Sequence, residues 1–272
     1  MSTTLIATKP TTNGHAHPAT GAPAAIGAPP ATVPTLRKTA LVAGILYLLT
    51  FVSIPSPFFL YDQVRNNPEY LLGPGPDTAV YFGGILEIIV ALAGIGTAVA
   101  LYPVLKRQNE GVALGLVGSR VLEAAGILAG VACLLAIVSL RQAGAGAAAL
   151  VTGQTLAILY GRIFLLSQSL MPALNDLWLG FLLYQSRLVP RVLPLLGLIG
   201  VPLLLAGFIG TLFNFWGPVS SVSGLLALPV ALFELSLGVY LTVKGFKPSP
   251  ILANATRDAG VTTSRNELEG DH

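Results

Sequence analysis

The sequence predicts an all-α protein, a polytopic bundle of six membrane-spanning helices. Hydrophobic residues make up 53% of the 272 residues and charged residues only 10%, whereas a soluble domain contains about 25% charged residues. The mean hydropathy is +0.75. The apolar residues also form runs of about 20 residues or more, the length that crosses the hydrocarbon core of a bilayer. Short polar segments separate these runs, so we expect a multi-pass membrane protein.

Six apolar runs are long enough to be spans. A short helix is expected to lie at the membrane surface near residues 145–160, where Gly, Ala and Thr interrupt the apolar pattern. Residues 37–247 would then form one transmembrane domain. The segments 1–36 and 248–272 are polar or rich in Ala, Pro, Thr and Gly, which predicts two disordered tails. The predicted spans are about residues 39–60, 78–105, 112–140, 162–184, 192–213 and 219–243.

The distribution of basic residues predicts the orientation of these spans. Lys and Arg are more frequent in cytoplasmic loops than in loops on the other side of a membrane. With six spans, the span ends that carry most of the basic residues fall on one side of the membrane, which is then the cytoplasmic side. Both termini lie on this side. A seventh span at 141–160 remains an alternative, but it would remove this asymmetry. We therefore expect a multi-pass protein of a bacterial inner membrane. The residues on the predicted cytoplasmic side are Arg37, Lys38, Lys106, Arg107, Arg187, Arg191, Lys244 and Lys247.

Several function classes find no support in the residues. Cys133 is the only cysteine, and no histidine lies in a predicted span, which excludes an internal disulfide, a cysteine metal cluster and bis-histidine haem ligation. The sequence contains no phosphate-binding loop and no nucleophile elbow. Its basic residues are scattered rather than clustered, so no nucleic-acid partner is expected. No cofactor or metal is expected, and an enzyme is the less favoured reading.

Charged residues inside the predicted spans carry the functional signal. They are costly in a bilayer and face protein or water. Depths can be counted from the predicted cytoplasmic ends with a rise of about 1.5 Å per residue. Arg120 then lies at a depth of roughly 12 Å, and so do Asp176 in the fourth span and Glu234 in the sixth. Arg120 is therefore expected to tie the third span to the fourth and sixth. The predicted polar cluster is Glu87, Arg120, Glu123, Asn175, Asp176 and Glu234.

These acids outnumber the basic residues at depth. Glu87 and Glu123 lie deeper than Arg120, so Glu123 is expected to turn toward Glu87, and Glu87 is the first candidate for an acid that is protonated, hydrated or cation-bound. Two functions stay open. One is a transport-like or proton-coupled protein that acts on a small solute or a proton. The other is a non-catalytic structural or accessory component in lipid, whose buried charges only hold the helices together.

Four short motifs in a fixed order resemble a known family. They are Ala-Gly-Ile-Leu-Tyr-Leu-Leu at 43–49, Leu-Tyr-Pro-Val-Leu at 101–105, Arg-Val-Leu-Glu-Ala at 120–124, and Gly-Phe-Leu-Leu-Tyr-Gln-Ser at 180–186 followed by Leu-Val-Pro-Arg at 188–191. In this order they resemble the bacterial membrane family called "domain of unknown function 4386", over about residues 38–246. The resemblance implies a multi-pass protein of uncharacterised function and brings no catalytic residue.

Overall fold

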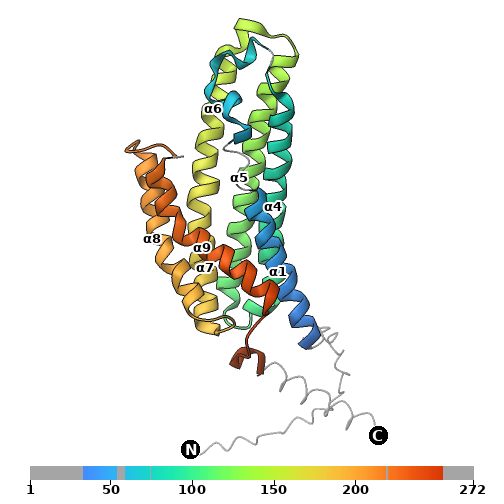
Figure 1. Cartoon of the computed structure of the whole chain (residues 1–272), viewed down its shortest axis with the longest axis vertical. Coiled ribbons are helices and arrows are strands. Elements are labelled where there is room, and N and C mark those ends of the chain that lie inside the picture. The colour runs from blue at the N-terminus through green and yellow to red at the C-terminus, as the bar shows by residue number, and fades with distance from the viewer. Residues whose placement is uncertain (1–32, 54–58, 74, 219, 254–272) are drawn as a thin grey trace, which may run out of the picture. The chain divides into compact units, whose positions relative to one another are not determined.

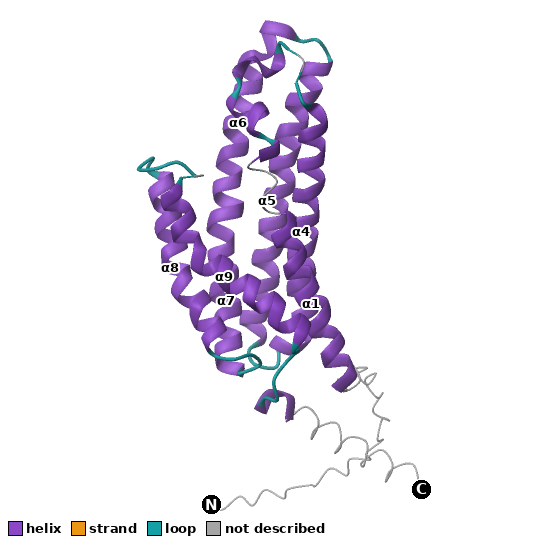
Figure 2. Ribbon diagram, in the orientation of Figure 1, coloured by secondary structure: helices purple, strands orange, loops and turns teal. Residues whose placement is uncertain are grey.

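The structure is a computed structural model, and it describes residues 33–53, 59–73, 75–218 and 220–253. Figure 2 shows helices and loops throughout this part of the chain, and no described residue lies in a β-strand. Six helical segments are long and apolar enough to cross a membrane. The predicted all-α bundle of six spans is therefore confirmed, and the protein is membrane-embedded.

The helices follow one another with short connections. The 3₁₀-helices η1 and η2 lie in the loops, and η3 is one turn of π-helix inside a span. In chain order the elements are α1 (Val33–Ser53), α3 (Asp62–Asn66), η1 (Pro68–Leu71), α4 (Asp77–Leu105), α5 (Glu110–Gln142), η2 (Gly146–Ala149), α6 (Leu150–Leu165), η3 (Leu166–Leu170), α7 (Met171–Ser186), α8 (Val192–Leu212) and α9 (Ser221–Val243).

Most predicted boundaries lie within two residues of the observed ones, but the two tails were drawn too long. Helix α1 begins at Val33, so residues 33–36 belong to the first span. At the other end, the Ser249 hydroxyl donates to the Ser186 carbonyl, and Leu252 packs against the core. Residues 248–253 are therefore part of the folded domain. The rest of both predicted tails, and residues 54–58 of the first span, lie outside the described residues.

The surface helix predicted near 145–160 is wrong. These residues form η2 and most of α6, and α6 runs directly through η3 into α7 as one helical segment, Gly146–Ser186. Helix α6 packs along α5, as Figure 1 shows. Gly and Ala weaken the hydropathy of this segment, yet they allow close helix packing. The segment therefore continues the helix of the fourth span, which is longer than a bilayer core requires, and the described residues 141–160 form no separate seventh span.

A proline explains the π-helical turn in the fourth span. Pro172 has no N–H to donate to the carbonyl of Gln168, and its ring crowds that carbonyl. The helix widens just before it, at Leu166–Leu170. Such turns rotate the side chains that follow and recur at functional sites. The fourth span therefore presents Tyr160, before the turn, and Asp176, after it, in a relation that a regular helix would not give.

The helices pair in a regular order. Helix α4 packs on α5 and α1, α9 packs on α8 and α1, and α7 packs on α8 and α5. Figure 1 shows α4, α5 and α6 running side by side, while α9 crosses obliquely between α8 and α1. The largest buried cluster lies where α1, α4, α5, α7 and α9 meet, and includes Leu101, Leu116, Leu182, Phe233 and Leu237. A second cluster lies at the other end of the bundle, around Tyr61, Leu134 and Tyr160.

The spans fall into two length classes. Helices α1, α8 and α9 contain 21, 21 and 23 residues, about 32–35 Å at 1.5 Å per residue, which matches a hydrocarbon core of about 30 Å. Helices α4 and α5 contain 29 and 33 residues, and the fourth span contains 41. The long helices therefore tilt or extend beyond the membrane.

Thr211, at the end of α8, lies at the level of Arg162 and Leu165, since all three line one pocket.

Candidate functional site

Arg120 is the centre of a buried polar cluster built by four helices. Its Nη1 donates to Glu123 Oε2 at 2.9 Å on the same helix, α5. Its Nη2 donates to Glu234 Oε1 on α9 at 2.8 Å and to the Tyr47 hydroxyl on α1 at 3.4 Å. The Arg120 side chain is 7% exposed. One guanidinium therefore ties three helices together.

Close packing of α1 on α9 brings these partners to Arg120. A Cβ built on Gly44 would lie 2.6 Å from the backbone nitrogen of Thr242 and 2.8 Å from the carbonyl of Gly238, so only glycine fits at this crossing. Tyr47 lies one turn after Gly44 on α1, and Glu234 lies one turn before Gly238 on α9. The glycine contact therefore sets both side chains at the level of Arg120.

Helix α7 adds an amide and a carboxyl group to the cluster. Asn175 Nδ2 donates to Glu123 Oε2 at 2.8 Å. Asp176 is fully buried and lies within electrostatic range of Glu234, Arg120 and Glu123. Neither carboxyl oxygen of Asp176, nor Asn175 Oδ1, has a hydrogen-bond partner among the described residues. Asp176 thus lies beside the hydrogen bonds of the Arg120 cluster without taking part in them.

The charges of this cluster do not balance. Three acids, Glu123, Asp176 and Glu234, surround one guanidinium, and Arg120 gives its two Nη groups to the two glutamates. If all three acids were ionised, two negative charges would stay uncompensated in a low-dielectric interior, which is costly. The group without a donor, Asp176, is the one that a proton, a water molecule or a cation has to complete.

Glu87 forms a second polar site, separate from the first. It is 1% exposed. Its carboxylate accepts hydrogen bonds from the Tyr61 hydroxyl at 3.2 Å, the Tyr160 hydroxyl at 3.2 Å and Gln168 Nε2 at 2.9 Å. The donors come from the segment before α3, from α6 and from η3. Burial, and the neighbouring Glu87 charge, raise the pKa of Tyr61, which keeps that donor protonated.

The structure differs from the expected grouping in three respects. Arg120 was expected to tie the third span to the fourth and sixth, but it is hydrogen-bonded to the sixth and the first, and not to Asp176 of the fourth. Glu123 was expected to turn toward Glu87, but it stays on Arg120 and Asn175. Glu87 was the first candidate for an acid that is protonated, hydrated or cation-bound, but it has three donors, whereas Asp176 has none among the described residues. The hydroxyl and amide partners of both sites were missed. Their only sequence signal is that tyrosines and a glutamine occur among apolar residues. The missed residues are Tyr47, Tyr61, Tyr160 and Gln168.

A third polar network lies at the far end of α4 and α5. Arg141 forms an ion pair with Asp77, and Gln142 Nε2 donates to the same carboxylate at 3.0 Å. The Tyr70 hydroxyl donates to the other oxygen of Asp77, and Arg141 also donates to the Gly73 carbonyl. Burial and the hydrogen bond to Asp77 raise the pKa of Tyr70. The network fastens the loop 59–73 to the ends of two spans.

Gln168 connects the Glu87 site to a pocket between the fourth span and the α8–α9 hairpin. The pocket has a volume of about 240 Å³. Most of its lining residues are apolar, and the polar ones are Gln168, Ser169, Thr211, Ser220 and Ser223. Since Gln168 also donates to Glu87, a single side chain separates the pocket from the buried acid.

Comparison with known proteins identifies the family and nothing closer. No match is found among curated proteins or among solved structures. The family model described as "Domain of unknown function (DUF4386)" matches residues 42–245, which run from within the first span to just after the end of the sixth. The chain therefore belongs to the DUF4386 family of membrane-embedded proteins.

Proposed function

We propose that this protein is a proton-coupled, transport-like protein of a bacterial inner membrane, and that Asp176 is the acid that takes up and releases the proton. The observation that carries the proposal is that Asp176 is fully buried and has no hydrogen-bond donor among the described residues. Ionisable groups inside membrane spans pair with one another or mark ion and substrate pathways. Asp176 is the acid of the cluster that does not pair.

The neighbours of Asp176 favour exchange of its charge. Glu234 and Glu123 repel a negative charge at this position, while Arg120 attracts it. Because Arg120 is hydrogen-bonded to both glutamates, its attraction is already shared. A small change in the position of Arg120 would change the balance of attraction and repulsion at Asp176. This is the property that a coupled transporter needs at its proton site.

The fourth span links the two buried sites. It carries Tyr160 and Gln168 of the Glu87 site and Asn175 and Asp176 of the Arg120 cluster, and Gln168 lies within the π-helical turn. On α4, Glu87 precedes Gly94, which faces Arg120 and Glu123, by seven residues, or about 10 Å. A proton or a small solute that reached Gln168 from the pocket between the fourth span and the α8–α9 hairpin would be about two helical turns from Asp176.

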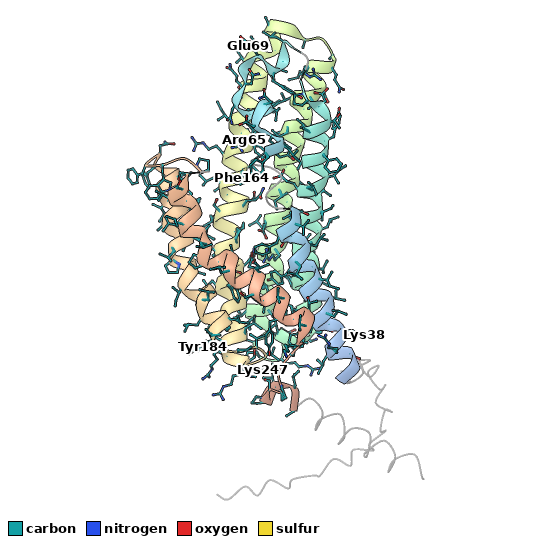
Figure 3. The ribbon with its side chains drawn as sticks, in the orientation of Figure 1. Lys38, Arg65, Glu69, Phe164, Tyr184 and Lys247 are labelled. Carbon is teal, nitrogen blue, oxygen red and sulfur yellow. The ribbon has the colours of Figure 1, made fainter. Side chains whose placement is uncertain are left out.

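The basic residues support the orientation that we propose, with both termini cytoplasmic. Figure 3 shows Lys38 and Lys247 at one end of the helices and Glu69 at the other. The excess of Lys and Arg at the first end is typical of the cytoplasmic side. The pocket that Gln168 lines, at the outer ends of α8 and α9, would then face the opposite side, and membrane lipid would cover the apolar outer faces.

A second function has its own supporting observation. Both Nη groups of Arg120 and both oxygens of Glu87 have partners, and these partners come from several helices. In an accessory membrane component, such contacts would only hold the bundle together. This alternative leaves Asp176 without a role, which is why we favour the first function.

Proton flux in liposomes tests the proposal. Purified protein would be reconstituted with an internal pH dye, and a potassium diffusion potential would drive proton entry. We expect flux above protein-free liposomes for the wild type, background flux for Asp176→Asn, and wild-type flux for Glu69→Gln, which changes an exposed acid. Wild-type protein without flux, or Asp176→Asn with full flux, would refute the proposal. The first result would favour the accessory component.

A further inference from the structure

We propose that a second pocket, between the loop 59–73 and α6, binds a small organic anion with a short apolar chain. The pocket has a volume of about 360 Å³. Its lining residues come from α3, the loop and η1 on one side and from α5 and α6 on the other. They are Val64, Arg65, Asn66, Asn67, Tyr70, Leu71, Ile137, Gly153, Gln154, Ala157 and Ile158.

Arg65 supplies the positive charge of this pocket. It is half-buried and forms no ion pair with a described residue. Its guanidinium carbon lies 5.4 Å from the centre of the Tyr160 ring, a cation–π contact that holds the side chain in place. The acids nearest in sequence, Asp62 and Glu69, are exposed and do not line the pocket. No acidic residue lines the pocket beside Arg65, although the buried Glu87 carboxylate lies within electrostatic range of its guanidinium.

Gln154 faces Arg65 from the opposite wall, on α6. Its amide makes no hydrogen bond with a described residue, whereas Asn66 and Asn67 donate to Asp62 and Gln63 on α3. An arginine fork binds a planar carboxylate with two parallel hydrogen bonds, and an amide can donate a third. The Arg65 guanidinium and the Gln154 amide could thus bind one carboxylate head group together.

The floor of the pocket is apolar. Val64, Leu71 and Ile137 are buried there, and Ala157 and Ile158 extend the apolar wall along α6. A volume of about 360 Å³ is near the lower end of the usual range for small-molecule sites. These features fit an anion of few carbon atoms better than inorganic phosphate, which has no apolar part, or a large lipid.

The pocket lies where a water-soluble anion can reach it. Its residues on α6, Gly153 to Ile158, precede Arg162, which is level with the end of α8. Ile158 is level with the end of α8, because it lines one pocket with Thr211, and Gly153 to Ala157 therefore lie beyond the last turn of α8, at the membrane surface. Figure 3 likewise shows Arg65 between Phe164 and Glu69 along the long helices.

This site is independent of the proposed proton coupling, although it adjoins the Glu87 site. Tyr160 offers its ring to Arg65 and its hydroxyl to Glu87, so one side chain touches both. Binding in the pocket can be measured without any flux. Failure of the anion site would leave the flux experiment on Asp176 unaffected, and the reverse also holds.

Isothermal titration of the purified full-length protein at pH 7 tests the inference. The probes are hexanoate, acetate and 1-hexanol, each corrected by titration into protein-free micelles. We expect saturable binding of hexanoate, and at least tenfold weaker binding of acetate, which lacks the chain, and of hexanol, which lacks the charge. Arg65→Gln should weaken hexanoate binding at least tenfold. Arg162→Gln, an exposed arginine outside this pocket, should leave binding unchanged.

A second variant separates the pocket from general effects of charge. Ala157→Phe fills the pocket while keeping Arg65, and we expect it to abolish hexanoate binding without a loss of thermal stability. Hexanoate binding that survives both Arg65→Gln and Ala157→Phe would overturn the inference. So would the absence of saturable hexanoate binding to the wild type, or equal binding of hexanol.

Discussion

Replacing Arg120 with glutamine should destabilise the bundle strongly. The substitution removes the ion pairs to Glu123 at 2.9 Å and to Glu234 at 2.8 Å. Glutamine is too short to reach both acids and carries no charge. The two glutamates and Asp176 would then share a buried space with no cation. The repulsion among them, added to the lost hydrogen bonds, is the physical cause of the expected effect.

The magnitude follows from how little water reaches these groups. The side chains of Arg120, Glu123 and Glu234 are 7%, 10% and 11% exposed. Removing one partner of a buried ion pair costs about 3–5 kcal/mol, because the remaining charge is left uncompensated. An interhelical hydrogen bond in a membrane bundle contributes only about 0.6 kcal/mol on average. We therefore expect Arg120→Gln to lower the free energy of unfolding by about 3 kcal/mol or more.

Unfolding in mixed detergent and dodecyl sulfate micelles measures this difference. The control is Arg162→Gln, which removes an exposed arginine that forms no ion pair with a described residue. The triple variant with Arg120, Glu123 and Glu234 all changed to glutamine removes the charges together and should recover part of the loss. A change below about 1 kcal/mol for Arg120→Gln would show that the guanidinium does not hold the helices, and would refute the reasoning.

Three further outcomes follow from the same contacts. Asp176→Asn should leave the free energy of unfolding within about 1 kcal/mol of the wild type, because Asp176 accepts no hydrogen bond from a described residue; a loss of more than 2 kcal/mol would contradict this. Glu87→Gln should lower the free energy of unfolding by about 1–3 kcal/mol, because an amide cannot accept the three hydrogen bonds of the carboxylate. Thermal unfolding of the Asp176→Asn and Glu87→Gln variants measures both effects. Because the pKa of Tyr70 is raised in the folded protein, its contribution to stability is complete below a pH of about 10, the ordinary tyrosine pKa, and is lost as the pH rises further. The difference in stability between the wild type and Tyr70→Phe should therefore shrink above that pH, and a constant difference would show that the hydroxyl is not protected.

The fold could be predicted closely from the sequence, because the length of an apolar run sets the length of a span. The beginning and end of α8, for example, were predicted to within one residue. The exception was residues 145–160, where Gly and Ala lower the hydropathy. Their role in packing α6 against α5 cannot be recognised from the hydropathy of the segment alone.

The candidate site was less predictable, because helical depth and helix rotation are different quantities. The rise per residue put Arg120 and Glu234 at one level, and the structure pairs them. Depth alone also put Asp176 there, but its carboxylate is not hydrogen-bonded to Arg120. The rotation of each helix about its axis decides such contacts, and the π-helical turn before Pro172 changes it for the whole of α7. The hydroxyl partners of Glu87 depend on the same rotations.

Whether water reaches Asp176 tests the proposed function most directly. Cys133 is the only cysteine, so Cys133→Ala gives a background in which Asp176→Cys can be labelled with a small, charged thiol reagent added to either side of liposomes. Leu179→Cys, at a fully buried position one turn further along α7, is the unlabelled control, and Gln185→Cys, at an exposed position, is the labelled one. A proton pathway predicts labelling at 176 and not at 179. Absence of labelling at 176 from both sides would show that the cluster is sealed, and would contradict the proposal.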